Sequence, residues 1–112
     1  MIAVDSPSYH AHVYFTPESE PLAAALRDKA QTALAGRAWV HPLVPRAVGP
    51  HPVPMFEINF AHDQRDAVIG WLDAHHGELS VLLHPITEDE LADHTLHVAW
   101  LGESQPLDPS KL

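Results

Sequence analysis

Four segments of the chain have the alternation of apolar and polar residues, or the richness in aromatic and β-branched residues, that is typical of strands. They span residues 9–15, 38–44, 55–60 and 79–84. The second segment contains Pro42, which cannot donate a hydrogen bond to a neighbouring strand, so we expect it at a sheet edge.

Segments with apolar residues at helical spacing lie between these strands. One helix is predicted over residues 21–34 and ends before Gly36, and another spans residues 63–75 and ends before Gly77. Glycine is suited to these positions because it readily adopts the left-handed conformation that closes a helix. A short acidic helix is expected after the last strand, over residues 87–92.

The resulting order of elements is β-α-β-β-α-β, which predicts an α+β, ferredoxin-like fold: an antiparallel sheet with two helices on one face. In this arrangement the first and third strands are central, and the fourth lies antiparallel beside the first. Residues 1–112 are expected to form a single domain, with residues 103–112 as an irregular tail.

Composition narrows the kind of function. Acidic residues outnumber basic ones by 15 to 6, and the formal charge of −9 argues against binding to nucleic acid or a polybasic contact with membranes. No apolar run approaches the ~20 residues that span a bilayer, and the N-terminus lacks the pattern of a signal peptide, so a cytoplasmic location is expected. There is no cysteine, whereas there are 10 histidines, the commonest metal ligands and proton carriers near neutral pH.

Strand alternation and strand order together place several of these histidines. Successive strand residues point to opposite faces, so one set of side chains falls on the face that the helices leave open. This set contains His10, His12, Tyr14, Glu57 and Asn59. His84, at the end of the fourth strand, lies beside the start of the first. Two or three imidazoles and one carboxylate would then meet, which is the ligand set of a facial-triad iron(II) site.

A structural interpretation competes with this one. A His-x-His pair on a strand is common in sheets that bind nothing, and a half-exposed carboxylate such as Glu57 is ordinary. The remaining histidines are interpreted as structural or solvated; they are His41, His62, His75, His76 and His97.

Five pieces of the chain, in order and at natural spacing, resemble the DOPA 4,5-dioxygenase family of small ring-cleaving proteins. They are YHAHVYF at 9–15, VGPHPVPMFEINF at 48–60, WL at 71–72, LSVLLHPITEDELADHT at 79–95 and AWLG at 99–102. The resemblance implies extradiol cleavage of a catechol such as DOPA by molecular oxygen, on a ferredoxin-like fold with a mononuclear non-haem metal. Fe(II) is the expected metal, with zinc as an alternative in purified protein.

The family-like histidines are His10, His12, His51, His84 and His94. His10, His12 and His84 are the predicted metal ligands. The resemblance gives His51 and His94 the proton chemistry of the catechol, although either could instead join the metal shell.

Substrate contacts are predicted from side-chain chemistry. Arg46 is the candidate for the carboxylate of a DOPA-like substrate because a guanidinium binds carboxylates bidentately; the alternative is a solvated loop arginine. Tyr14 could donate a hydrogen bond to bound oxygen, and Glu57 is the third candidate for substrate binding.

The loop at residues 45–54 raises a question of geometry. It should lie toward the end of the first strand, whereas His84 lies toward its beginning. His51 can therefore join the site only if the loop folds back over the open face, or if a second chain supplies one part. An open sheet face on a small domain favours a homodimer. Two rival functions stay open: a non-catalytic ligand-binding or regulatory dimer that retains the fold, and a cofactor-free enzyme acting on small molecules.

Overall fold

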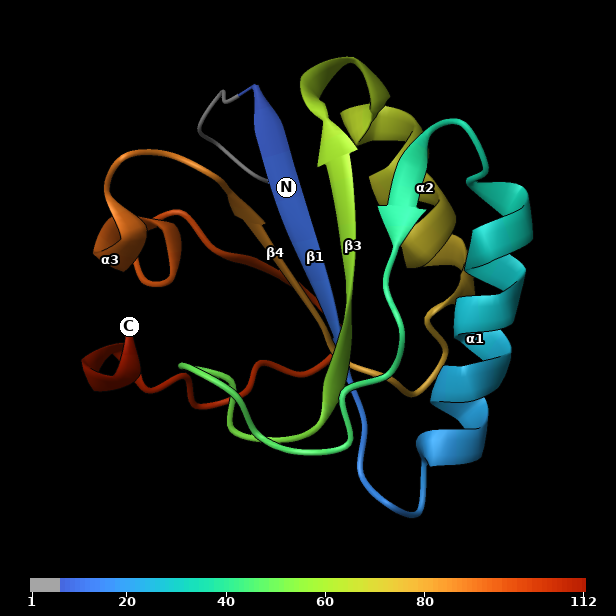
Figure 1. The fold of residues 1–112 in the computed structure, drawn as a ribbon, viewed down its shortest axis with the longest axis horizontal. Helices are drawn as coiled ribbons and strands as arrows, with labels where there is room; N and C mark the ends of the chain where they lie inside the picture. Colours follow the sequence, from blue (N-terminus) through green and yellow to red (C-terminus); the bar gives the residue numbers. More distant parts are fainter. Residues whose placement is uncertain (1–6) are drawn as a thin grey trace.

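The protein, described over residues 7–112 by a computed structural model, is built on a five-stranded sheet (Figure 1). The strands are β1 (Ser8–Tyr14), β2 (Ala38–Val40), β3 (Met55–Ala61), β4 (Val81–Pro85) and β5 (Ala99–Leu101). Their order across the sheet is β2-β3-β1-β4-β5, and every neighbouring pair is antiparallel. The predicted ferredoxin-like α+β fold is confirmed, with β1 and β3 inside the sheet and β4 beside β1.

The two long helices, α1 (Glu20–Ala33) and α2 (Arg65–His75), lie on one face of the sheet, and the short helix α3 (Glu90–Asp93) lies on the other (Figure 1). Single 3-10 turns occur at His62–Gln64 and Pro109–Lys111. Gly36 and Gly77 follow the long helices with φ of 77° and 59°, so both take the left-handed conformation for which glycine was expected there. No helix in the described part of the chain combines the length and the apolar character needed to cross a bilayer.

The main hydrophobic core lies between the sheet and the two long helices. It contains the inward-facing residues Ala11, Val13 and Ile58, none of which is exposed to solvent. The opposite face carries a smaller cluster of Tyr14, Met55 and Leu82. Residues from the 45–54 loop and from the segment after α3 pack against this cluster; they are Val48, Val53, Val98, Trp100 and Leu107. The open face is therefore partly covered by irregular chain, and Trp100 is part of that packing.

Several predicted boundaries are wrong, each for a local reason. The strand predicted over 38–44 ends at Val40, and only an isolated bridge between Val44 and Met55 continues it, because Pro42 interrupts the ladder. The strand predicted over 79–84 begins at Val81, since the amide of Leu79 still bonds to the carbonyl of His76 in the turn after α2.

The short acidic helix is also shifted. It was predicted over residues 87–92 but spans Glu90–Asp93, because Asp89 caps it by accepting a hydrogen bond from the amide of Ala92 at 3.0 Å. The second long helix, predicted to begin at residue 63, begins at Arg65, because Asp63 lies inside the 3-10 turn that precedes it.

The C-terminal segment forms more structure than the βαββαβ order required. β5 adds an edge strand beside β4, with Leu82 opposite Trp100. The predicted irregular tail ends in one 3-10 turn and returns over the open face, where the amide of Asp108 donates to the carbonyl of Pro50 at 2.9 Å. This contact joins the tail to the 45–54 loop.

Candidate metal centre

The sheet register brings three predicted ligands together. His10 is directly opposite His84 in the β1–β4 pair, and His12 is two residues farther along β1 on the same face. One ligand atom from each ring lies within 4.8 Å of the other two, close enough for all three to bind one metal ion. His12 and His84 are almost fully buried, with 2% and 1% of their surface exposed, whereas His10 is partly exposed.

The hydrogen bonds around these rings suit metal binding. Nδ1 of His84 donates to the carbonyl of Pro85 at 2.9 Å, which leaves Nε2 as the nitrogen with a free lone pair. Nε2 of His12 lies 3.0 Å from Nε2 of His84. If both lone pairs face a metal, the proton of His12 resides on Nδ1, which is buried without a hydrogen-bond partner and has Glu57 Oε1 at 3.7 Å. This tautomer directs an N–H of His12 at the carboxylate, whereas a proton on Nε2 would leave a lone pair of Nδ1 facing the carboxylate oxygen.

Burial keeps the imidazoles neutral. It lowers the pKa of His12 well below its ordinary value, and the neighbouring imidazoles His51 and His84 lower it further. Burial also lowers the pKa of His84 to about 4, although the hydrogen bond to Pro85 opposes the shift. Because a histidine must be neutral to bind a metal, these rings are ready as ligands at neutral pH.

The 45–54 loop does fold back over the open face, within the same chain. The ring of His51 lies 4.1 Å from that of His12 between centroids, and the Tyr14 hydroxyl lies 2.7 Å from Nδ1 of His51. No other acceptor for this buried hydroxyl is present within residues 7–112, so Tyr14 donates and Nε2 of His51 carries the proton. Burial raises the pKa of Tyr14 and lowers that of His51 to about 4. His51 therefore joins the site without a second chain, and the homodimer stays a prediction.

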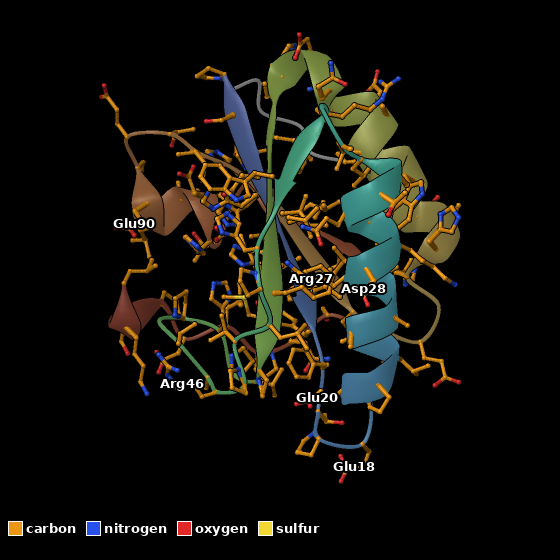
Figure 2. All side chains as sticks on the ribbon, turned by 45° about the vertical axis from the view of Figure 1, so that its right-hand side comes forward. Glu18, Glu20, Arg27, Asp28, Arg46 and Glu90 are labelled. Carbon is orange, nitrogen blue, oxygen red and sulfur yellow. The ribbon has the colours of Figure 1, made fainter. Side chains whose placement is uncertain are left out.

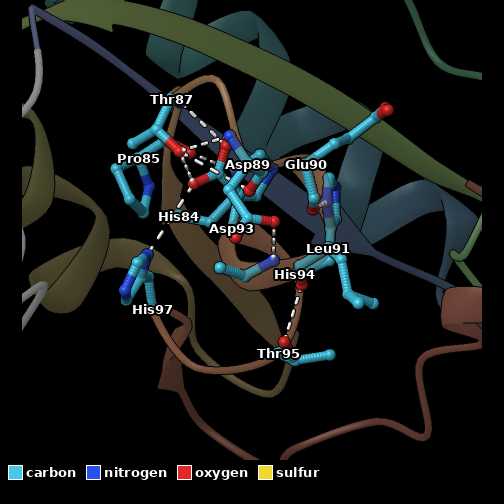
Figure 3. Close-up of polar contacts among 11 residues, drawn as sticks. His84, Pro85, Thr87, Asp89, Glu90, Leu91, Asp93, His94, Thr95 and His97 are labelled. Carbon is cyan, nitrogen blue, oxygen red and sulfur yellow. Dashed lines mark hydrogen bonds and ion pairs between the residues drawn. The ribbon is translucent and has the colours of Figure 1, made fainter.

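His94, the residue directly after α3, approaches from the other side. Its ring centroid is 4.3 Å from that of His84 and 6.0 Å from that of His51. Nδ1 of His94 donates to the carbonyl of Glu90 at 2.9 Å, so Nε2 is left as a proton acceptor. Figure 3 shows that Asp93 fastens this helix by accepting hydrogen bonds from the amide of Thr87 at 2.8 Å and from its hydroxyl at 2.6 Å.

These side chains surround a pocket of about 580 Å³. The three predicted ligands lie on its sheet side, and residues 48–51 and 86–88 with α3 form other parts of its wall. Four carboxyl side chains line it, namely Glu57, Glu88, Glu90 and Asp93, whereas no lysine or arginine does so among the described residues.

Not every predicted substrate contact reaches this pocket. Arg46 is exposed and lies outside the lining, on the side of the sheet opposite α1 (Figure 2). Tyr14 is buried behind His51 and does not line the pocket either. Glu57 does line it, but its carboxylate lies beside the imidazoles, with Oε1 3.3 Å from Nδ1 of His10, and it is not a member of the three-histidine group.

Residues 9–111 match the Dopa 4,5-dioxygenase family. The chain belongs to this family. Among its relatives, a DOPA 4,5-dioxygenase of Amanita muscaria is 34% identical over 93% of this chain and 49% of its own length. An "Uncharacterized 21.2 kDa protein" of Botryotinia fuckeliana is 45% identical over 66% of this chain and 42% of its own length. The chain thus spans about half the length, or less, of these curated relatives.

A solved structure of similar fold supports the architecture of this Dopa 4,5-dioxygenase family chain. The crystal structure of a "putative dioxygenase" from Nostoc punctiforme superimposes with a TM-score of 0.85 at 33% sequence identity. The match covers 94% of this chain and 90% of that one, so the sheet that carries the histidines is common to both.

One polar contact on this face, between His41 and Asn59, was not predicted from the sequence. His41, assigned a structural role, donates through Nε2 to Oδ1 of Asn59, and Asn59 donates through Nδ2 to Oε2 of Glu57 at 3.0 Å. Strand parity places Asn59 and Glu57 on one face, but the partner of His41 depends on how β2 and β3 pair. The amide of His41 bonds to the carbonyl of Glu57, which continues the pairing of these strands one residue beyond Val40.

Proposed function

We propose that this protein catalyses metal-dependent extradiol cleavage of a catechol such as DOPA, with both atoms of O₂ incorporated into the ring-opened product. The observation that carries the proposal is the group of His10, His12 and His84, whose ligand atoms lie within 4.8 Å of one another at a pocket of suitable size. Membership of the Dopa 4,5-dioxygenase family and the name of the Amanita muscaria relative support it.

His10, His12 and His84 would hold the metal, which we propose is Fe(II); zinc in purified protein would occupy the same three nitrogens. Imidazole nitrogens suit both ions, and three protein ligands leave room for substrate. A bound metal would lower the pKa of the catechol hydroxyls and let electrons pass from the ring to O₂, which no side chain can do alone.

The two outer histidines are suited to different parts of the proton chemistry. Nδ1 of His94 carries a proton and donates a hydrogen bond to the carbonyl of Glu90, so Nε2 of His94 can accept a proton from the catechol. Nδ1 of His51 accepts a hydrogen bond from the Tyr14 hydroxyl, so the N–H at Nε2 can donate a hydrogen bond to an oxygen that becomes negatively charged during the reaction. We therefore assign His94 as the base and His51 as the donor, with Tyr14 acting through His51.

The remaining substrate contacts are less direct. Arg46 stays the candidate for a substrate carboxylate, because it lies on the loop that covers the open face and no lysine or arginine of residues 7–112 lines the pocket itself. Glu57 is placed to border the substrate, although its oxygens already face the imidazoles.

The test combines metal analysis with turnover. The purified protein, loaded with Fe(II) without oxygen, is mixed with DOPA and simple catechols in air while visible absorbance and oxygen uptake are recorded. We expect a coloured ring-opened product and stoichiometric oxygen uptake, and loss of both bound metal and turnover in His12→Ala and His84→Ala.

Absence of colour and of oxygen uptake across all catechols would reject the proposal. The non-catalytic alternative would then be favoured, with the 3.0 Å contact between His12 and His84 as an ordinary hydrogen bond between two buried histidines.

A further inference from the structure

Two rows of cross-strand neighbours run over the open face toward the three histidines. In the first row, the amide of His41 bonds to the carbonyl of Glu57 at 2.9 Å, and Glu57 is directly opposite His12. The second row contains Trp39, Asn59, His10 and His84 in that order. Directly opposite residues have side chains within contact distance. Along each row, the side chain at the sheet edge can therefore restrict the orientation of the next one, up to the histidines at the centre of the sheet.

Polar contacts join the two rows into one chain. Nε2 of His41 donates to Oδ1 of Asn59, and Nδ2 of Asn59 donates to Oε2 of Glu57 at 3.0 Å. The other oxygen, Oε1, lies 3.3 Å from Nδ1 of His10 and 3.7 Å from Nδ1 of His12. One oxygen of the Glu57 carboxylate is therefore bound by Asn59, which His41 at the sheet edge supports, and the other oxygen faces the imidazoles of His10 and His12.

We propose that Glu57, Asn59 and His41 are positioning residues that fix the orientation of the His10 and His12 rings for metal binding. The inference rests on the proposed metal site, and it adds a function for two residues outside that site. A ligating histidine commonly needs its second nitrogen anchored, which sets both the tautomer and the ring orientation.

Each of the three ligands then has an anchor, and His10 and His12 share theirs. Nδ1 of His84 donates to the Pro85 carbonyl, so that ring needs nothing further. His10 has a 30% exposed side chain, so packing alone does not fix its rotation, and Glu57 is the group beside its Nδ1. For His12 the same carboxylate is the nearest acceptor to an otherwise orphaned nitrogen.

The sheet edge supports the outer end of the chain. Trp39 is 71% exposed, yet its ring stacks on that of His41 with centroids 5.2 Å apart and planes 7° from parallel. In this proposal Trp39 restricts the rotation of the His41 ring and keeps its Nε2 directed at Asn59.

The test measures metal affinity and metal geometry, separately from turnover. Zn(II) dissociation constants are obtained by competition with a chromophoric chelator, and the visible spectrum of the Co(II) protein reports the ligand arrangement. We expect Glu57→Gln to weaken Zn(II) binding by roughly 10- to 100-fold and to change the Co(II) spectrum. His41→Ala should weaken binding by a smaller factor, roughly three- to tenfold, and His41→Gln, which retains an N–H donor, should restore part of the loss.

A double variant separates positioning from independent effects. Because His41 acts through Glu57, Glu57→Gln combined with His41→Ala should bind Zn(II) no more weakly than Glu57→Gln alone. Glu78→Gln and His75→Ala, which are exposed and remote from the pocket, are the matched controls and should bind as the wild type does. Thermal unfolding of the metal-free variants checks that each one folds.

The outcomes are distinguishable from failure of the metal site itself. If the wild type binds Zn(II) tightly and Glu57→Gln binds it within twofold with an unchanged Co(II) spectrum, the positioning role is rejected while the metal site stands. Additive losses in the double variant would also reject it, since His41 would then act by another route. If the wild type binds no metal, both the metal site and the positioning chain are rejected.

Discussion

At the scale of single residues, the site depends on imidazoles that stay neutral because they are buried. Burial alone would make any polar ring costly, and two of the buried rings have one nitrogen matched to a partner: the Pro85 carbonyl for His84 and the Tyr14 hydroxyl for His51. The remaining nitrogens are therefore available for a metal or a substrate. The same burial makes the protein sensitive to acid.

The pKa shifts predict how stability varies with pH. His51 and His84 have folded pKa values of about 4, below the value near 6.5 of an unfolded histidine, so the unfolded state binds protons first as pH falls. The metal-free protein should lose stability steadily as the pH falls from about 6.5 toward 4. Below pH 4 these two groups should cause no further loss. Thermal unfolding at half-unit pH steps measures this.

Between about pH 6.5 and pH 5, the change in stability comes mainly from histidines, since most carboxyl groups are still ionised there. His84→Gln should show a shallower slope in that window than the wild type. An equal slope in both proteins would contradict the assignment of the sensitivity to His84.

At the scale of elements, the pocket wall depends on a helix of four residues, which is too short to be stable by itself. Asp93, buried with 2% exposed, holds it by accepting both the amide and the hydroxyl of Thr87 (Figure 3). Asp89 caps its other end. The position of His94 therefore follows from side-chain hydrogen bonds and not from helix propensity.

Asp93→Ala should loosen α3 and displace His94. Leaving the Thr87 amide unpaired costs on the order of 1–3 kcal/mol of stability. Because His10, His12 and His84 belong to β1 and β4, Zn(II) affinity should change little, whereas catechol turnover should fall steeply. Asp89→Ala, which removes only the cap, is a milder comparison. A parallel fall in Zn(II) affinity for Asp93→Ala would show that α3 supports the metal ligands directly.

At the scale of the whole molecule, stability and chemistry are divided between the two faces of one sheet. The helix-covered face is apolar and closed, and the open face holds the histidines under a cover of irregular chain. Strand alternation lets one strand serve both faces, with Ala11 and Val13 inside the core and His10 and His12 outside it. Metal binding should consequently stabilise the fold without rebuilding it.

Added metal should raise the unfolding temperature. A ligand that binds only the folded state adds about 2.7 kcal/mol at a free concentration of one hundred times its dissociation constant. Differential scanning fluorimetry with Zn(II) should show an upward shift that a chelator reverses and that His12→Ala abolishes. An equal shift in His12→Ala would place the responsible ion elsewhere on the protein.

The sequence by itself determined the order of strands and helices as far as α3, the face on which each strand residue lies and the residue types available as ligands, because these follow from local periodicity and side-chain chemistry. His10, His12 and Glu57 could be grouped in this way, and the usual strand order of the fold added His84.

Only the tertiary structure decided which atoms meet. The fold-back of the loop that carries His51 and the pairing that joins His41 to Glu57 depend on contacts between residues far apart in the chain. The turn that presents His94 depends on the hydrogen bonds that Asp93 accepts from Thr87. Local propensity carries no information about such contacts. They are selected by the packing of irregular segments against one another, as in the hydrogen bond between Asp108 and Pro50 that holds the tail to the loop over the open face.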